Sequence, residues 1–234
     1  MRDCGGKVRI CLDVSPAVHH RAGIGRYAGE LAAALLALDG EEVYSLFYNR
    51  AAEAHVAPPL DRLPRRTTHL GDKPWRLGVL LAYLGRRPQD HLLPGADLFH
   101  ATDHLLPRLS RVRTVFTLHD LTVRICPEAH TPLNRTYLSL MMPRFLRAAD
   151  AVIAVSECTR RDAMRLYGLD ESRIRVVYEG VHPRFRPAPP DQVEAVRHRY
   201  DLPEHTILYV GTLEPRKNLG TVLAAYRELR RQGT

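Results

Sequence analysis

Residues 8–38, VRICLDVSPAVHHRAGIGRYAGELAAALLAL, combine the two apolar patterns that decide the fold class. Residues 8–14 form a short, mostly apolar run of strand length. The residues that follow repeat apolar side chains at helical spacing, at Ile24, Tyr27, Leu31, Leu35 and Leu38. The stretch therefore predicts a strand followed by an amphipathic helix.

The same alternation of strand and helix continues toward the C-terminus. Further strand candidates are residues 43–48, 98–101, 114–118, 151–155 and 174–178. Helical patterns lie between them, around residues 75–85, 133–148 and 158–167. Short apolar strands separated by helices are typical of a parallel sheet covered on both faces, so we predict a doubly wound, Rossmann-like α/β domain of about 185 residues.

A proline-rich segment ends this domain. Residues 182–190, HPRFRPAPP, cannot sustain a helix or a central strand and predict an extended linker, which a short charged helix follows at residues 191–200. Residues 206–232, TILYVGTLEPRKNLGTVLAAYRELRRQ, then predict a buried strand, a tight loop and an amphipathic helix. One strand and one helix cannot bury a core, so we expect this part to be poorly packed or to lean on the first domain.

The charge balance favours anionic partners. The chain has 34 Lys and Arg against 26 Asp and Glu, a formal net charge of +8. Nucleotide phosphates, lipid head groups and nucleic acid all fit this surplus. No nucleic-acid-binding signature and no run of five cations is present, so we do not expect a nucleic-acid partner.

The cysteines and the N-terminus indicate a cytoplasmic protein. Cys4, Cys11, Cys126 and Cys158 lie far apart without CxxC spacing, which favours reduced thiols over a zinc site or a disulfide framework. The first residues, MRDCGGKVRICLDV, lack the apolar core of a signal peptide, and the longest apolar run is too short to span a bilayer.

Two loops carry candidate phosphate-binding features. Arg216 and Lys217 lie at a predicted strand-to-helix junction, where adjacent cations and free helix N–H groups suit a phosphate; the alternative is a solvated pair. Residues 23–28 fit G-x-G-x-x-A, but they do not directly follow the strand, which argues against NAD. We expect Gly23 and Gly25 to form a loop whose backbone approaches a ligand, or merely to cap the helix.

Several blocks in order resemble one enzyme family. They are Asp13 followed by GIGRYAGEL, then DLFHATDHLLP, TVFTLHDLT, ADAVIAVSECTRRD, RIRVVYEGV and ILYVGTLEPRKNL. Together they resemble the retaining family-4 glycosyltransferases of the GT-B fold, also known as glycosyl transferases group 1. The resemblance is strongest to bacterial mannosyltransferase-type members that build cell-surface polysaccharides, and it covers nearly the whole chain.

The resemblance implies a two-domain enzyme with its nucleotide-sugar donor in the cleft between two Rossmann-like domains. Residues 1–184 would be the N-terminal acceptor-side domain and residues 185–204 a linker and short helix. Residues 205–234 would be the truncated start of the C-terminal domain that binds the nucleotide sugar. The family's E-x7-E donor carboxylates would lie beyond residue 234. Glu171 and Glu179 have that spacing, but they fall in the first domain and match a chance pair.

The resemblance also implies roles for individual residues. Arg216 and Lys217 match the pair that holds the donor diphosphate in place of a metal, and Gly23 and Gly25 match the loop that closes over that group. His119 matches a histidine facing the transferred sugar; otherwise it is a structural histidine bound by its neighbouring carboxylate. In such a reaction fixed cations and backbone donors stabilise the charge that grows on the departing diphosphate.

Two carboxylates are candidates for the acceptor site. Asp13 and Asp120 follow strands at the carboxyl edge of the predicted sheet, where α/β sheets bind ligands. Each would orient an acceptor hydroxyl or cap a turn.

The expected function is metal-independent transfer of a mannose-like hexosyl group from a GDP- or UDP-linked sugar, with retention, to a saccharide or polyprenyl-linked acceptor. No cofactor is expected, and the chain by itself is expected to be inactive. The alternative is a non-catalytic acceptor-binding half that pairs with a separate donor subunit.

Peripheral contact with the inner face of the membrane is a separate expectation. It rests on an apolar patch followed by Arg86 and Arg87. The alternative is a helix packed on the sheet, with these arginines in water. The patch consists of Trp75, Arg76, Leu77, Leu80, Leu81 and Leu84.

Overall fold

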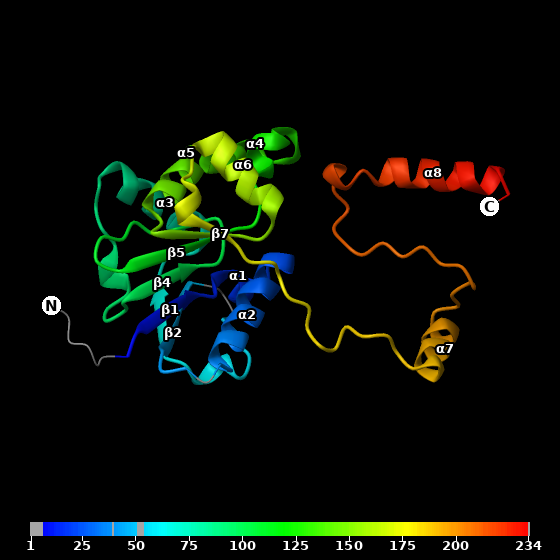
Figure 1. Ribbon diagram of the computed structural model, residues 1–234, viewed down its shortest axis with the longest axis horizontal. Coiled ribbons are helices and arrows are strands. Elements are labelled where there is room, and N and C mark those ends of the chain that lie inside the picture. The colour runs from blue at the N-terminus through cyan, green and yellow to red at the C-terminus, as the bar shows by residue number, and fades with distance from the viewer. Residues whose placement is uncertain (1–6, 39, 51–53, 234) are drawn as a thin grey trace. The chain divides into compact units, whose positions relative to one another are not determined.

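A single parallel sheet organises most of the chain. The computed structural model describes residues 7–38, 40–50 and 54–233, apart from the side chain of Arg216, and divides the chain into two units, Met1–Glu179 and Gly180–Thr234. In the described part of the first unit the strands are β1 (Arg9–Asp13), β2 (Val43–Asn49), β3 (Arg65–Thr68), β4 (Leu98–Ala101), β5 (Arg113–Leu118), β6 (Ala151–Ala154) and β7 (Ile174–Val176). They pair in the order β3-β2-β1-β4-β5-β6-β7, each pair parallel (Figure 1).

Helices connect these strands. In the first unit they are α1 (Ser15–Val18), α2 (Ala22–Leu36), α3 (Asp72–Leu84), α4 (Thr122–Ile125), α5 (Pro132–Ala148) and α6 (Glu157–Tyr167). The second unit contains α7 (Pro190–Arg199) and α8 (Leu219–Arg231). Short 3-10 turns occur at η1 (Leu60–Arg62), η2 (Asp90–Leu92), η3 (Pro127–Ala129), η4 (Glu171–Arg173) and η5 (Pro215–Lys217).

The core lies in two layers because side chains alternate across the strands. Phe47 packs in a large cluster with residues of α3, α5 and α6, such as Trp75 and Phe145. Its neighbour Leu46 packs in a second cluster with residues of α1 and α2, such as Ala32. Helices therefore cover both faces of the sheet, as Figure 1 shows, and the doubly wound α/β prediction is confirmed.

Local signals explain where the helices begin and end. The hydroxyl of Ser156 accepts a hydrogen bond from Thr159 N at the start of α6, and Gly168 ends that helix in the left-handed conformation with φ of 62°. Thr131 caps α5 in the same way, with Pro132 in the first turn. Such boundaries match the predicted helices within a few residues.

One strand of the sheet escaped prediction. β3 (Arg65–Thr68) has the sequence RRTT, pairs only with β2 among the described strands, and buries Thr68 alone. An edge strand with one neighbour needs few apolar residues, so it carries no apolar run for sequence analysis to detect. The other predicted strands of the first unit are confirmed with small changes at their ends.

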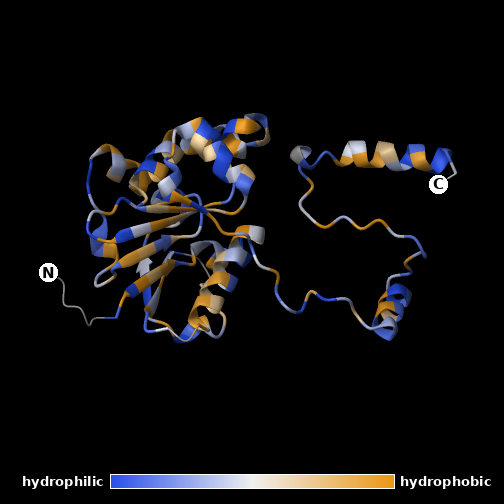
Figure 2. Ribbon diagram, in the orientation of Figure 1, coloured by the Kyte–Doolittle hydropathy of each residue, from blue (hydrophilic) through white to orange (hydrophobic). Residues whose placement is uncertain are grey.

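The second unit lacks the strand that we expected within residues 206–210. The described residues there form no strand, and the side chains of Ile207, Leu208 and Val210 are 74%, 80% and 83% exposed. A β-strand needs a paired neighbour, and the described part of this unit contains none. The helix predicted from Asn218 or Leu219 is confirmed as α8, and Figure 2 shows its apolar positions interspersed with polar ones.

Two features of the described residues concern membranes and metals. None of their helices combines the length and the apolar character needed to cross a bilayer. They also contain no group of three or more His, Cys, Asp or Glu side chains arranged to hold a metal ion. Cys11, Cys126 and Cys158 are free thiols, and Cys4 lies outside the described residues.

Candidate functional site

The strand order places a candidate site at the carboxyl ends of β1 and β4. From β1 the chain moves outward to β2 and β3, and then returns to β4 on the other side of β1. Open α/β sheets bind ligands at such a switch point, outside the carboxyl ends of the strands. Asp13 ends β1, Thr102 follows β4 and His119 follows β5, so two of the predicted site residues lie at this edge.

Thr102 connects these two residues. Its hydroxyl donates to the main-chain carbonyl of Asp13 at 2.6 Å, and its own carbonyl lies 2.9 Å from Nε2 of His119. A carbonyl only accepts, so Nε2 of His119 is the donor. The hydrogen bond fixes the ring tautomer and leaves Nδ1 as the nitrogen available to other groups.

The His119 ring is held on several sides. It packs edge-on against Tyr27, with ring centroids 4.8 Å apart and planes at 89°. Its Nδ1 lies 3.3 Å from Oε1 of Glu179, and its main-chain carbonyl accepts a hydrogen bond from Thr159 Oγ1 at 3.2 Å. The side chain is 9% exposed, so the ring is ordered by contacts with α2, the residue after β4 and the segment after β7.

Asp13 is buried and caps a turn. Its Oδ1 accepts hydrogen bonds from Ser15 N at 2.9 Å and from Ser15 Oγ at 2.5 Å. Burial raises the pKa of this carboxyl to about 7; the charge of Asp103 adds to the shift, while the Ser15 hydrogen bonds and Arg21 oppose it. The turn-capping alternative therefore describes the contacts that Asp13 makes in this structure.

A cluster of charged side chains beside Asp13 was missed by the sequence analysis. Arg21 donates to Oδ2 of Asp72 at 2.6 Å and to Oδ2 of Asp103, so one guanidinium connects two carboxylates. Partial burial favours the protonated form of Asp72, but Arg21 outweighs this effect and holds the pKa of Asp72 below its usual value. Asn49 Nδ2 also donates to Asp72, at 3.3 Å. The available signal was the run of polar residues after three neighbouring strands.

A second group that was not predicted from the sequence consists of His100, Thr117 and Tyr27. Nε2 of His100 is 2.8 Å from Thr117 Oγ1, and the hydroxyl of Tyr27 is 3.1 Å from the same oxygen. Burial, with a smaller effect from His119, lowers the pKa of His100 to about 4, so this ring is neutral at physiological pH. Burial also lowers the pKa of His104, whose Nδ1 has no hydrogen-bond partner in the structure.

Asp120 lies on the surface next to His119. Its Oδ1 accepts hydrogen bonds from Thr122 N at 2.9 Å and from Thr122 Oγ1 at 2.7 Å. The residue is exposed, and the hydrogen bonds stabilise the start of α4.

The two glycines do not form the loop that we expected. Both lie in the first turns of α2, so the loop prediction is wrong. A Cβ atom at residue 25 would lie 2.6 Å from the carbonyl oxygen of Pro16, whereas one at residue 23 would have no neighbour within 4 Å. Gly25 therefore permits the close packing of α1 and α2, and Gly23 leaves the start of α2 open. No side chain caps this helix start.

Arg216 and Lys217 belong to the second unit, which the structure describes by itself. Both lie in η5, and Lys217 N donates to the carbonyl of Glu214 at 3.0 Å. The side chain of Arg216 lies outside the described residues, and Lys217 is exposed. Asn218 follows with φ of 49° and begins α8. The expected order of loop, basic pair and helix is present.

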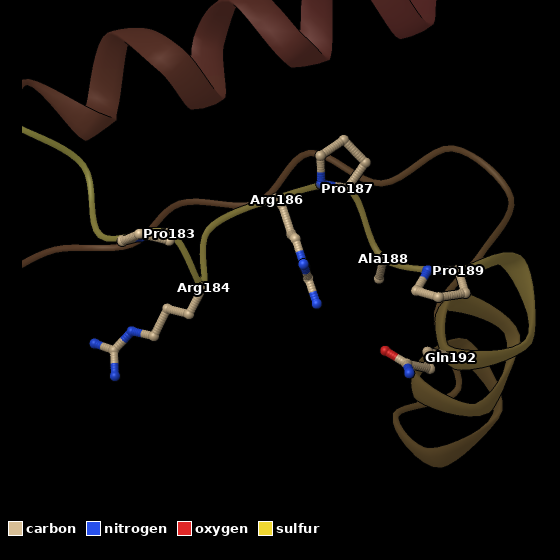
Figure 3. Close-up of a pocket in the computed structure, with 7 residues that line it drawn as sticks. All are labelled: Pro183, Arg184, Arg186, Pro187, Ala188, Pro189 and Gln192. Carbon is tan, nitrogen blue, oxygen red and sulfur yellow. The ribbon is translucent and has the colours of Figure 1, made fainter.

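The linker forms an open hollow of about 710 Å³ at the start of α7 (Figure 3). Its lining is proline and arginine from the linker together with Gln192 of α7. None of the residues selected by the sequence analysis lines it. The lining residues are Pro183, Arg184, Arg186, Pro187, Ala188, Pro189 and Gln192.

Comparison with known proteins gives consistent results. The family model described as Glycosyltransferase Family 4 matches residues 21–185. The chain is 29% identical over 239 residues to O-antigen chain mannosyltransferase B of Escherichia coli, covering 95% of this chain and 60% of that protein. It is 35% identical over 117 residues to D-inositol 3-phosphate glycosyltransferase of Streptosporangium roseum, covering 49% of this chain and 26% of that protein.

A solved structure shows the same fold. Anabaena Alr3699/HepE, solved in complex with UDP and glucose, matches with a TM-score of 0.50 and 18% identity. The match covers 83% of this chain and 50% of that one. The chain thus spans about half the length of this structure and 60% of the length of the Escherichia coli relative.

Proposed function

We propose, from the premise that the chain belongs to glycosyltransferase family 4, that it carries the acceptor side of a retaining hexosyltransferase. The reaction would move a mannose-like group from a GDP- or UDP-linked sugar to a saccharide or polyprenyl-linked acceptor in cell-surface polysaccharide synthesis. The Escherichia coli and Anabaena proteins support this choice by their names and by the bound UDP and glucose.

The observation that carries the proposal is the Thr102 connection between the ends of β1 and β5. It connects the Asp13 turn and the His119 ring at the switch point of the sheet, where a ligand would contact both. Asp13 and Asp120 are the candidate groups for acceptor hydroxyls, and His119 is the candidate that faces the transferred sugar. Because Asp13 carries the raised pKa, it can donate as well as accept near neutral pH.

In the proposed reaction the bond from the sugar C1 to the donor phosphate oxygen breaks, and a bond from C1 to the acceptor oxygen forms on the same face. The acceptor proton goes to the departing phosphate. Lys217, Arg216 and the open start of α2 at Gly23 are the proposed donors to the diphosphate, so no metal ion is needed. Gly25 acts there through the packing of α2.

A transfer assay with binding measurements tests the proposal. The protein would be incubated with labelled GDP-mannose or UDP-glucose and an oligomannoside in EDTA, and oligomannoside binding would be followed by saturation-transfer NMR. We expect binding that His119→Ala weakens, and any transferred sugar to keep its anomeric configuration. Inverted products, or products that require a metal, would overturn the proposed reaction.

The second candidate function is a non-catalytic acceptor-binding half that pairs with a separate donor subunit. The observation in its favour is the exposed apolar surface of the second unit, where Ile207, Leu208 and Val210 bury little. For the 234 residues alone we expect acceptor binding without efficient transfer, which agrees with this candidate. Transfer by the chain alone would exclude it, and absence of both binding and transfer would exclude both candidates.

Peripheral membrane contact at the cytoplasmic face is a further part of the proposal. In α3 the expected patch divides, because Trp75 is buried against the sheet and Leu80 packs beside the core. The leucine stripe, defined as Leu77, Leu81 and Leu84, stays 54%, 57% and 58% exposed. Their spacing places them on one side of the helix, and the exposed Arg86 and Arg87 follow it.

Co-sedimentation with anionic vesicles tests this contact. Leu81→Ser and the Arg86→Glu, Arg87→Glu double variant should both reduce binding several-fold. Leu133→Ser is the matched control, since Leu133 is 74% exposed on a different helix. Binding that is unchanged in both test variants would exclude the leucine stripe as a membrane contact.

A further inference from the structure

Glu179 is the last residue of the first unit and lies beside the candidate site. Its Oε1 is 3.3 Å from Nδ1 of His119, within ion-pair distance. The carboxylate is half exposed, so it is not needed to fill the core. The sequence analysis gave it no role.

The hydrogen-bond geometry of His119 makes this contact informative. Nε2 donates to the Thr102 carbonyl, which uses the single N–H of a neutral ring. Nδ1 is the ring nitrogen that remains, and it faces the Glu179 carboxylate at ion-pair distance.

The other groups near the ring differ in kind from Glu179. Tyr27 packs against it edge to face, and His104 lies with its centroid 5.9 Å from that of His119. Burial, with a smaller effect from His119, lowers the pKa of His100 to about 4, so that ring is neutral at physiological pH. Burial also lowers the pKa of His104, against the opposing charges of Asp103 and Asp120. The Oδ1 of Asp120 accepts from Thr122. Glu179 is the carboxylate that lies at ion-pair distance from Nδ1.

We propose that Glu179 is a positioning residue for His119. Its carboxylate holds the ring through Nδ1, so that His119 keeps the orientation in which it faces the proposed sugar and diphosphate. This use in transfer rests on the proposed function, but the pairing itself does not.

Nitrogen-15 NMR of the histidine rings tests the pairing on the chain itself. In Glu179→Gln the Nδ1 resonance of His119 should shift from its wild-type position, while the Nε2 resonance should stay at its wild-type position. Glu179→Asp, which is one methylene shorter, should give a partial shift. A His119 spectrum that is unchanged in Glu179→Gln would overturn the proposal.

Glu171→Gln is the matched control. Glu171 has the same side chain in the same unit, but it is 69% exposed and pairs with Arg160 at 2.8 Å. The Glu171→Gln variant should leave the His119 resonances unchanged. A shift equal to that in Glu179→Gln would also overturn the proposal. Wherever transfer is measurable, Glu179→Gln should lower kcat with little change in acceptor KM. A protein that shows the NMR shift but neither binds acceptor nor transfers sugar would contradict the proposed function alone.

Discussion

Two five-residue segments with similar sequences have opposite environments in the two units. TVFTL at residues 114–118 lies in β5 between β4 and β6, and Phe116 and Leu118 are both 0% exposed. TILYV at residues 206–210 forms no strand in the second unit, where Leu208 is 80% exposed. An apolar run becomes a strand only when a neighbouring strand pairs with it. Composition does not supply that neighbour.

Truncating one leucine in each segment should give the largest difference. Leu118→Ala should lower the free energy of unfolding by about 2–5 kcal/mol, because it removes a fully buried side chain and leaves a cavity. Leu208→Ala is the matched change at an exposed site and should stay within about 0.5 kcal/mol. Urea unfolding of both variants checks this. Similar losses in the two would show that the second unit also has a packed core.

The raised pKa of Asp13 gives the next effect. The folded protein keeps this proton up to about pH 7, whereas the unfolded chain releases it near the usual value of 3.8. Stability is therefore lost as the pH rises between these two values and changes no further above them. The amide introduced by Asp13→Asn cannot titrate, so the stability advantage of this variant over wild type should grow by about 2–3 kcal/mol between about pH 5 and 8.

Urea unfolding of both proteins at the two pH values measures this change. The difference in the free energy of unfolding between the variant and wild type at the lower pH serves as the baseline, because it already contains the effect of hydrogen bonds lost or gained with Ser15. A difference between the proteins that does not vary with pH would contradict the burial argument.

Substitutions at Gly23 and Gly25 distinguish a role in helix packing from a role in ligand binding. Gly25→Ala should destabilise by about 1–3 kcal/mol, because its Cβ would meet the Pro16 carbonyl at 2.6 Å. Gly23→Ala has open space and should be neutral or stabilise by up to about 1 kcal/mol in α2. If Gly23 approaches the diphosphate, its variant should weaken nucleotide-sugar binding in calorimetry. Equal free energies of unfolding for the Gly25→Ala and Gly23→Ala variants would contradict the packing role of Gly25.

The smallest effect on stability is expected at Lys217. Lys217→Ala removes an exposed side chain and should change the free energy of unfolding by less than about 0.5 kcal/mol. Binding of GDP or UDP, measured by calorimetry, should nevertheless weaken about tenfold, since a charged contact to phosphate is worth about 1.5–3 kcal/mol. Arg227→Ala on α8 is the control for general charge. Equal weakening in both variants would exclude a specific phosphate contact.

Most of the first unit could be predicted because its strands are buried on both faces. Such strands are continuous apolar runs, and β4 was located at its observed bounds. β3 could not be found, since an edge strand of RRTT has no apolar signal. The prediction of a strand at residues 206–210 was wrong for the opposite reason. The apolar run was present there, but the described part of the second unit contains no neighbouring strand for it to pair with.

The candidate site was predictable from local sequence only where strand ends mark it. Asp13 and Asp120 follow strands, so the carboxyl-edge rule selected both, whereas His119 was selected by the family resemblance. Arg21, Asp103 and Glu179 come from loops or segment ends whose meeting depends on the order of strands in the sheet. No local sequence pattern predicts that order, so the contacts of these residues could be identified only in the structure.

The hydrogen bond from His119 ends on a main-chain atom of Thr102, and this affects how the site tolerates substitution. Every amino acid at position 102 supplies the same carbonyl, so replacement of the threonine by a residue without a hydroxyl removes its bond to Asp13 and leaves the bond to His119. A scan of single substitutions would therefore assign Thr102 to the β1 turn alone. The orientation of the histidine is inherited from the path of the backbone after β4, and only a change in the length of that loop would alter it.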